Sequence, residues 1–420
     1  MNLSERISQT KKEMVRKVSE LVSIPTPVPP GDNYEEAADW LKEFLQDCNA
    51  KVRTMTAPAE LSKTLEAELI GPRINVLGEY NLGAGPSIIV AGHYDVVPVD
   101  ERKWDTPPFE AVEKNGRVFG RGTADQKGAL VSSIISIREL IEERGEHLCG
   151  KIVVVATPDE EVGGSAGFGW LMEDKKVSAD ECLVTDGGME TLVIAASGTL
   201  RAKLTSLGQS GHSSKPWLAR NAIHDMIPVM SSLLELSKDV EKRVSEIKYM
   251  SQGQVSNIRP SLNLDVIHAG VKVNIIPDEC TLLLDRRVSP EEDPDMAEKE
   301  IMRIIEEEKA KNPELDLRVE SGMLHTNFLS PSDSRYLQAL KSVYRRITGL
   351  DPFVGGSTGA LDACYSVRRD IPTVTFGAAT PDSNTHGSNE SVSVDDLVAY
   401  AQIVSHSLEA YLTEEKGDTL

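Results

Sequence analysis

The sequence predicts an α/β protein in which a mostly parallel mixed sheet is flanked by helices and an α+β domain of ferredoxin-like order is inserted. Three observations lead to this prediction. Short runs rich in Val and Ile alternate with helical segments, which is typical of a mostly parallel sheet covered on both faces. A later stretch is patterned β-α-β-β-α-β. The 420 residues also exceed what one ordinary hydrophobic core accommodates.

The first half of the chain supplies the elements of the larger domain. Residues 6–23 and 34–47 place apolar side chains at spacings of three and four, which predicts two amphipathic helices. Strands and helices then alternate, in the order strand 87–91, helix 127–144, strand 151–156, helix 164–175 and strand 181–185. This alternation predicts βαβ units that build one sheet.

The pattern changes after Ser197, where the inserted domain begins. Its predicted elements are strand 199–207, helix 219–236, a broken strand over 263–268 and 271–275, strand 280–288, helix 294–311 and strand 315–320. Helix and strand alternation resumes from Ser332. We therefore expect residues 1–196 and 324–420 to form the larger domain and residues 197–323 to form the inserted one.

The charge balance excludes some partners. The chain has 66 acidic and 45 basic residues, a formal charge of −21. Such a field repels phosphate backbones and anionic lipids, so we expect neither nucleic acid nor a membrane as partner. No apolar run approaches the roughly 20 residues that a membrane-spanning helix needs. The five cysteines are scattered without a C-x-x-C pair, which fits a reducing compartment, and we predict a cytoplasmic protein.

Metal-binding side chains follow several of the predicted strands. In open α/β sheets, ligands collect at the carboxyl ends of the strands. The groups found there are His93 and Asp95, then Asp159, Glu160 and Glu161, then Asp186, and finally His386 in a C-terminal loop. Carboxylates that converge in this way repel one another and are costly to desolvate unless cations hold them. Nitrogen and oxygen ligands without cysteine suit zinc, with cobalt or manganese as substitutes.

These motifs occur in an order that resembles a known family, the M20 metallopeptidases. Its members include acetylornithine deacetylase, succinyl-diaminopimelate desuccinylase, aminoacylase, carboxypeptidase G and carnosine-type dipeptidases. The resemblance rests on Gly92-His93-Tyr94-Asp95, the run from Gly120 to Gly128, Glu160-Glu161, Asp186, Gly211-His212-Ser213 and His386-Gly387. It implies a zinc-peptidase-like catalytic domain, and the inserted domain falls where the family carries its dimerisation lid.

The resemblance also implies the residues of a two-zinc site. Asp125 would bridge the two ions and be followed by a cis peptide bond. His93 and Asp186 would complete one ion's ligands, and Glu161 and His386 those of the other. Among the remaining groups, Glu160 would be the general base and Asp95 would orient His93. The side chains of neighbours Glu160 and Glu161 diverge, but only the resemblance says which of them binds metal.

The inserted domain would supply groups for the substrate. His212 matches the family histidine that stabilises the tetrahedral oxyanion, often in the neighbouring subunit's site. Asn263 and Arg287 match positions that hold a substrate carboxylate, a task that suits a planar guanidinium. A surface ion pair is the alternative interpretation of Arg287. The resemblance therefore implies a homodimer that forms through residues 197–323.

The chain departs from the family pattern around Gly355-Gly356. Deacylases of the family usually follow this pair closely with Asp-Ala-Arg, whereas here Asp362-Ala363 comes later and Cys364 replaces the arginine. The bridging motif contains Asp-Gln-Lys-Gly instead of the Asp-Met-Lys-Gly frequent in the biosynthetic deacylases. These departures leave the choice between a deacylase and a dipeptidase or carboxypeptidase open.

Two further hypotheses compete with a metal-dependent enzyme. The run from Gly355 to Gly359 contains G-x-S-x-G, so Ser357 could be a nucleophile with His386 as base and Asp362 or Asp382 behind it. That hypothesis leaves the clustered acids unexplained. A non-catalytic binding protein of the same fold is the other alternative, although every expected catalytic position is filled.

The sequence as a whole predicts a metal-dependent amidohydrolase for a small-molecule substrate. Two zinc ions would activate a water molecule, and Glu160 would take its proton. The substrate would be an N-acyl amino acid or a short peptide with a free carboxylate.

Overall fold

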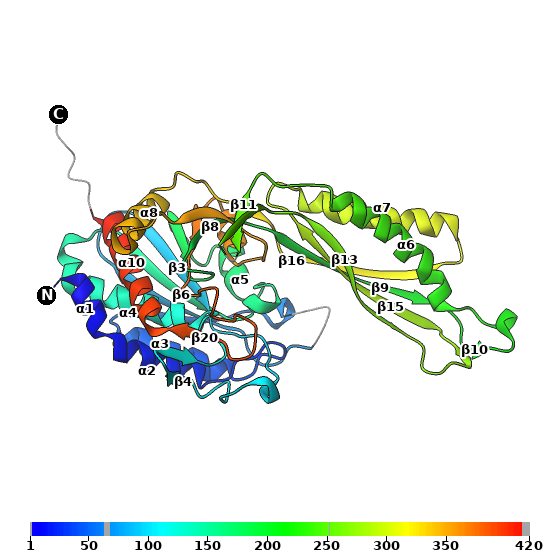
Figure 1. The fold of residues 1–420 in the computed structure, drawn as a ribbon, viewed down its shortest axis with the longest axis horizontal. Coiled ribbons are helices and arrows are strands. Elements are labelled where there is room, and N and C mark those ends of the chain that lie inside the picture. Colours follow the sequence, from blue (N-terminus) through cyan, green and yellow to red (C-terminus); the bar gives the residue numbers. More distant parts are fainter. Residues whose placement is uncertain (1, 63–67, 252, 414–420) are drawn as a thin grey trace.

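The computed structural model describes residues 2–62, 68–251 and 253–413. Figure 1 shows a larger body, which contains the first and the last helix, and a narrower one that extends from its side. We call the elements from β9 to β16, residues 198–325, the smaller body and the rest the larger body. Both contain a sheet with helices packed on it, as the predicted fold class requires.

The larger body is built on a nine-stranded mixed sheet. Its strand order is β1-β2-β6-β3-β7-β19-β8-β17, with β18 paired to β8. The central strand β3 runs parallel to both β6 and β7, whereas β1, β2 and β17 pair antiparallel to their neighbours. The strands are β1 (Lys51–Thr56), β2 (Ile74–Asn81), β3 (Ser87–His93), β6 (Lys151–Thr157), β7 (Glu181–Val184), β8 (Thr191–Ala196), β17 (Phe328–Leu329), β18 (Phe353–Ser357) and β19 (Thr373–Thr375).

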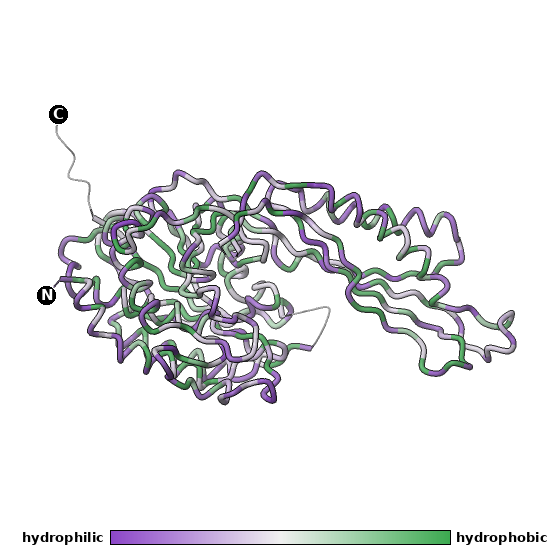
Figure 2. The backbone as a smooth tube through the Cα atoms, viewed as in Figure 1, coloured by the Kyte–Doolittle hydropathy of each residue, from purple (hydrophilic) through white to green (hydrophobic). Residues whose placement is uncertain are grey.

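Helices cover both faces of this sheet because its central strands are apolar along most of their length. Successive residues of β3 alternate between two cores: Ile88 and Val90 enter one, and Ile89 and Ala91 the other. The first core contains the helices α1 (Leu3–Gln9), α2 (Lys11–Val22), α3 (Tyr34–Asp47), α4 (Lys127–Arg144), α8 (Arg335–Thr348) and α10 (Val394–Leu412). The second contains α5 (Phe168–Glu173) and α9 (Ala363–Val367). Figure 2 shows the hydrophobic central strands between more hydrophilic helices.

A small three-stranded sheet lies beside the carboxyl-terminal helix. It has the order β20-β5-β4 and consists of β4 (Val112–Lys114), β5 (Arg117–Phe119) and β20 (Ser391–Ser393). Because β20 is antiparallel to β5, it brings the loop before α10 next to the segment that leads into α4. That pairing matters for the site, since each segment carries a candidate metal ligand.

The smaller body has the predicted β-α-β-β-α-β order. Its four-stranded sheet has the order β13-β15-β9-β16, and α6 and α7 pack on one face of it. The elements are β9 (Gly198–Leu207), α6 (Ala222–Val240), β13 (Ser261–Ala269), β15 (Glu279–Val288), α7 (Pro294–Lys311) and β16 (Asp316–His325). Two short pairs complete it: β10 (Gly211–His212) with β14 (Ile275–Ile276), and β11 (Lys248–Ser251) with β12 (Gln254–Asn257).

The structure differs from the sequence-based expectations in several places. The strand expected over 271–275 is mostly bend and turn, with only β14 at its end, and the strand expected to end at Glu320 continues to His325 in β16. The helix expected over 6–23 is interrupted at Thr10, which closes α1 and precedes α2. The helix expected over 164–175 is only α5, because Gly163 and Gly164 have φ of +108° and +65° and form a turn before it. The hairpin β11-β12 lies in a stretch for which no element was predicted. In the part of the chain that the structure describes, no helix is both long and apolar enough to cross a membrane.

Candidate active site

Two imidazoles approach one aspartate at the carboxyl end of β3. His93 is the last residue of β3, and its Nε2 lies 3.2 Å from Asp125 Oδ1. His386 comes from the loop before β20, and its Nε2 lies 3.1 Å from Asp125 Oδ2. Each carboxylate oxygen of Asp125 therefore faces a different histidine, which is the arrangement that a bridging ligand requires.

The remaining candidate ligands complete two groups around Asp125. One group contains His93, Asp125 and Asp186, and the other contains Asp125, Glu161 and His386. Within each group the potential ligand atoms lie within 4.8 Å of one another. Glu161 Oε1 also lies 3.2 Å from His386 Nε2. The structure thus brings together all five residues that the sequence predicted as metal ligands.

Backbone contacts hold these side chains in place. Asp95 accepts hydrogen bonds from the backbone N–H groups of Glu160 (3.2 Å) and Glu161 (3.1 Å), and its own carbonyl oxygen lies 3.0 Å from His93 Nδ1. Its carboxylate lies 3.5 Å from the same nitrogen. Asp95 therefore fixes both the imidazole of His93 and the turn that carries the two glutamates.

Glu390 performs a similar task for Asp125. Its fully buried Oε1 accepts hydrogen bonds from the backbone N–H groups of Gly122 (3.1 Å), Ala124 (2.9 Å) and Asp125 (3.1 Å), while its other oxygen pairs with Arg121. The peptide bond between Asp125 and Gln126 is cis, as the resemblance implied. The loop that presents Asp125 is thus tied to the segment that carries His386.

Burial and mutual repulsion favour protonated carboxyl groups in this cluster. Burial, reinforced by the charge of Asp125, raises the pKa of Asp186 to about 7. Burial also raises the pKa of Glu160 well above its ordinary value, against the opposing charge of His93. Hydrogen bonds to Asp125 and Glu161 raise the pKa of His386 to about 10. Divalent cations would displace these protons and offset the repulsion, so the donor set fits metal ions.

A cavity of about 470 Å³ opens onto the cluster. Glu160 lines it and belongs to neither group that shares Asp125, but to a third set of possible ligand atoms with His325 and Asp362. The smaller body contributes Thr199, Arg201 and Arg287 to the wall. Arg287 donates from Nε to Asp285 Oδ1 (2.7 Å) and from Nη1 to Thr199 Oγ1 (2.9 Å). It therefore combines a place in the cavity wall with the ion pair that was the alternative interpretation.

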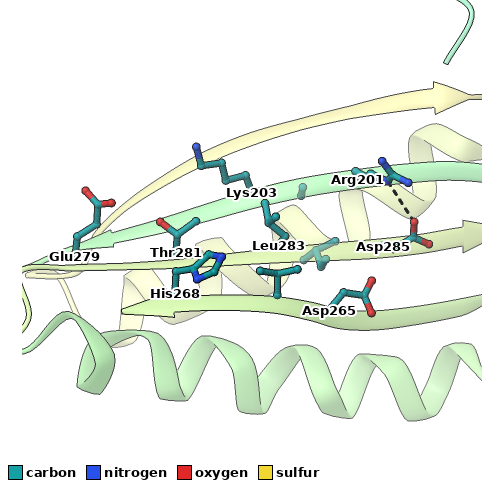
Figure 3. A pocket seen from close by; sticks show the side chains of 11 residues that line it. Arg201, Lys203, Asp265, His268, Glu279, Thr281, Leu283 and Asp285 are labelled. Atoms are coloured by element: carbon teal, nitrogen blue, oxygen red, sulfur yellow. Dashed lines mark hydrogen bonds and ion pairs between the residues drawn. The ribbon is translucent and has the colours of Figure 1, made fainter. Parts of the chain in front are cut away.

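A groove on the open face of the smaller body's sheet also includes Arg201. Figure 3 shows its strands, with Arg201 and Asp285 joined across β9 and β15 at 3.5 Å. Charged side chains of both signs line it, among them Lys203, Asp265 and Glu279. Because Arg201 lines both the groove and the cavity, the two hollows meet at this residue.

The other two candidates from the smaller body do not line the cavity. His212 lies in β10, at the end of the smaller body away from the larger one, where it is exposed and its Nδ1 contacts Ser214 Oγ at 2.8 Å (Figure 1). Asn263 lies on β13 opposite Asp285, with its side chain exposed. Within one chain, the structure places neither residue beside the ligand cluster.

The geometry does not assemble the serine hydrolase alternative. Ser357 lines the cavity, and its Oγ accepts a hydrogen bond from the backbone N–H of Gly359. His386 directs Nε2 at Asp125 and Glu161, and Asp382 pairs with Arg117. Cys364, which stands where deacylases carry an arginine, is fully buried in the core.

Comparisons with known proteins agree with this geometry. Residues 89–410 match the model of peptidase family M20/M25/M40. The chain belongs to this family. It is 29% identical over 335 residues to the succinyl-diaminopimelate desuccinylase of Hydrogenovibrio crunogenus, covering 77% of this chain and 83% of the relative. It is 30% identical over 357 residues to that of Buchnera aphidicola, covering 81% and 89%.

Solved structures of the M20 family share the fold. An M20 metallo-carboxypeptidase from Sulfolobus solfataricus has a TM-score of 0.78 at 21% identity, covering 95% of this chain and 99% of that one. The di-peptidase Dug1p of Saccharomyces cerevisiae has a TM-score of 0.78 at 16% identity, covering 99% and 98%. A dinuclear metal binding M20 peptidase from Bacillus subtilis has a TM-score of 0.64 at 16% identity, covering 97% and 100%. The protein is a metal-dependent hydrolase of amide bonds.

Sequence reasoning missed several residues of the site. Thr199 and Arg201 were not singled out, and neither was His325, which lines the cavity next to Asp362. Asp362 was considered in the departure from the family pattern and as a member of the serine relay, but not as a partner of His325. The signal for Arg201 was its position two residues before Lys203 on an alternating strand, but alternation alone does not say what the open face meets.

Proposed function

We propose that this M20 hydrolase uses two zinc ions to cleave the amide bond of an N-acyl amino acid, as a deacetylase or desuccinylase does. One observation carries the proposal: two groups of ligand atoms share Asp125, whose two oxygens face different histidines. The relatives at 29–30% identity are named succinyl-diaminopimelate desuccinylases, which supports an acylated amino acid as substrate.

The residues for two metal ions are present. His93, Asp125 and Asp186 would hold one ion, and Asp125, Glu161 and His386 the other. Their nitrogen and oxygen donors suit zinc, and cobalt or manganese could replace it. When bound, the pair supplies an activated water and polarises the scissile carbonyl.

The protein's own side chains would then move the proton and hold the substrate. Glu160, in the cavity wall outside both ligand groups, takes the proton of the attacking water and passes it to the leaving nitrogen. Asp95 keeps His93 oriented from behind. Arg287 offers its guanidinium to the substrate carboxylate, with Asn263 as a second candidate. His212 stabilises the developing oxyanion from the neighbouring subunit.

We further propose that residues 197–323 are a lid through which two copies form a homodimer, with residues 1–196 and 324–420 as the catalytic domain. The place of His212 supports this, because it is remote from the cavity of its own chain (Figure 1). Exposed apolar side chains on the smaller body also support it, namely Trp217, Leu218, Ile267, Val271 and Val273. Light scattering should give the mass of two chains, and a monomer would contradict the dimer.

A dipeptidase or carboxypeptidase is the alternative activity. Proteins of this fold with those names cover nearly the whole chain, although at 16–21% identity. Such an enzyme could use the same base and ligands on an unblocked peptide. The two activities differ in the group on the carbonyl side of the scissile bond, which is an acyl group in a deacylase substrate and an amino-acid residue in a peptide.

A hydrolysis panel tests the proposed function. The protein would be supplied with zinc, cobalt or manganese and given N-succinyl-diaminopimelate, N-acetylornithine, N-acetyllysine and unblocked dipeptides. We expect an acylated substrate to be cleaved fastest, activity to disappear with a chelator, and Glu160→Gln to be inactive. Glu113→Gln, an exposed acid on β4, is the matched control. Faster cleavage of dipeptides would favour the alternative, and activity that survives the chelator would refute a metal mechanism.

A further inference from the structure

A histidine and a carboxylate outside both ligand groups lie next to Glu160. His325 Nε2 is 3.2 Å from Asp362 Oδ1 and 3.8 Å from Glu160 Oε1. All three residues are buried, with exposed fractions of 6%, 4% and 8% for His325, Asp362 and Glu160. Both carboxylates face the same imidazole nitrogen, which is hydrogen-bonded to Asp362 and lies near Glu160, so one N–H stands between two buried acids that would be costly without a partner.

Three segments that are far apart in the chain meet at this point. His325 is the last residue of β16 and pairs with Thr199 of β9 after a register shift at Met323, and such irregularities re-aim side chains. Asp362 directly precedes α9, and Glu160 begins the short 3-10 helix η4 (Glu160–Val162) that follows β6. The imidazole therefore joins the end of the smaller body to two loops of the larger one.

Further contacts fix this junction. The ring of Tyr365 lies 5.9 Å from the ring of His325, and its hydroxyl donates to the carbonyl oxygens of Gly163 and Leu324. A Cβ added at Gly164 would lie 2.1 Å from Asp362 Oδ1. The turn after Glu160 thus approaches Asp362 and the end of β16 as closely as it does because a glycine stands there.

From these contacts we infer that His325, held by Asp362, is a positioning residue for Glu160. The inference rests on the proposed function, since it takes Glu160 as the general base. A glutamate side chain has three rotatable bonds, and the charges of Asp186 and Glu161 repel it. The His325 Nε2–H, fixed by its hydrogen bond to Asp362, faces Glu160 Oε1 at 3.8 Å and favours the glutamate rotamer that keeps the carboxylate beside it.

Leucine and glutamine at position 325 separate this task from simple packing. In the zinc-loaded full chain, His325→Leu should lower kcat by about 10- to 100-fold, the cost typical of losing a group that orients a catalytic one. KM should change by less than about threefold, because substrate contacts remain. His325→Gln carries an N–H donor near the Nε2 position and should recover most of kcat. His406→Leu, which removes a partly buried histidine on α10, should leave kcat unchanged.

Two measurements show whether His325 acts through Glu160. In Glu160→Asp the shorter side chain already holds its carboxylate farther from His325. Adding His325→Leu to this variant should therefore lower kcat by a smaller factor than it does in the native chain. A crystal structure of His325→Leu should show the Glu160 carboxylate in another rotamer, with zinc content unchanged by elemental analysis. An unaltered kcat or a lost metal equivalent in His325→Leu would overturn the inference. So would a double variant whose loss in kcat equals the product of the two single losses.

The same experiments keep the two proposals apart. The native protein and Glu160→Gln are assayed first. If the native protein cleaves no amide, the proposed function falls and the positioning task falls with it. If Glu160→Gln is inactive while His325→Leu keeps the native kcat, only the positioning task is wrong.

Discussion

The candidate functional residues are clustered in the larger body and dispersed in the smaller one. The five candidate ligands come from separate segments of the larger body, yet their ligand atoms gather around Asp125. The three candidates of the smaller body are dispersed: Arg287 lines the cavity, Asn263 is exposed on β13, and His212 lies at the far end. The candidate ligands thus gather within the larger body of one chain, from strand ends of its main sheet and from two loops joined by the small sheet, whereas the candidates of the smaller body do not meet within one chain.

The largest expected effect tests whether two metal ions share Asp125 as a ligand. Asp125→Asn should remove both metal equivalents, whereas Asp186→Asn should remove only one. Each should lower kcat/KM by at least about 10³-fold, because losing an ion removes several kcal/mol of charge stabilisation. Elemental analysis and the hydrolysis assay measure the two effects, with Asp395→Asn on α10 as the control. An Asp125→Asn protein that keeps one full equivalent would contradict the shared ligand.

The cluster could be predicted because its signals are local. Strand ends are visible as apolar runs followed by polar residues, and helices 34–47, 127–144 and 294–311 keep their predicted bounds in α3, α4 and α7. Periodicity within one segment carries that information. The choice of Asp125 and the division of the candidate ligands into two groups, however, came from the resemblance and not from spacing.

The rest of the site depends on contacts that leave no local pattern. His325 meets Asp362 across 37 positions, and Tyr365 meets Gly163 across 202. The strand predicted to end at Glu320 continues to His325 in β16, which is what carries the imidazole to the cavity. Neither the continuation nor the partner is encoded in the alternation of that strand, so the histidine could not be identified from sequence.

The next prediction tests whether His212 completes the active site of a second copy of the chain. His212→Ala should lower kcat by about 10²- to 10³-fold, the cost typical of losing one oxyanion donor. Mixing it with inactive Glu160→Gln, with subunit exchange, should restore activity. In a mixed dimer the His212→Ala chain keeps its own Glu160 and receives the partner's imidazole, so one of the two sites is intact.

The amount restored makes this test sharp. With random exchange of equal amounts, half the dimers are mixed and about one quarter of all sites become active. A mixture of His212→Ala with Asp125→Asn should behave in the same way. Activity that stays at the level of the separate variants would place His212 outside the partner's site and leave its exposed position unexplained.

A smaller effect distinguishes the arginine of the cavity wall from the ligands. Arg287→Ala should raise KM for a substrate with a free carboxylate by about 10- to 100-fold, since hydrogen bonds to charged groups are worth roughly 1.5–3 kcal/mol. Metal content should not change. Arg287→Lys keeps the charge but loses the planar guanidinium, so its KM should lie between that of the native protein and that of Arg287→Ala. An equal effect on a substrate amidated at that carboxylate would show that Arg287 only pairs with Asp285.

The last prediction concerns metal affinity, not turnover, and follows from the protons that the ligand cluster holds. Burial and the charge of Asp125 raise the pKa of Asp186 to about 7, and hydrogen bonds to Asp125 and Glu161 raise that of His386 to about 10. Metal binding needs both groups deprotonated, so zinc affinity should fall as pH falls. The neighbouring Asp95 and Asp125 also raise the pKa of His93 well above its ordinary value, against the effect of burial, so metal displaces protons from both imidazoles and, below pH 7, from Asp186 as well. The apparent Kd for zinc, measured by chelator competition, should therefore rise at least about tenfold for each unit by which pH falls from 8 to 7, and more steeply from 7 to 6. Arg287→Ala should keep this profile and Asp186→Asn should lose the steeper part, because the titrating groups belong to the larger body alone.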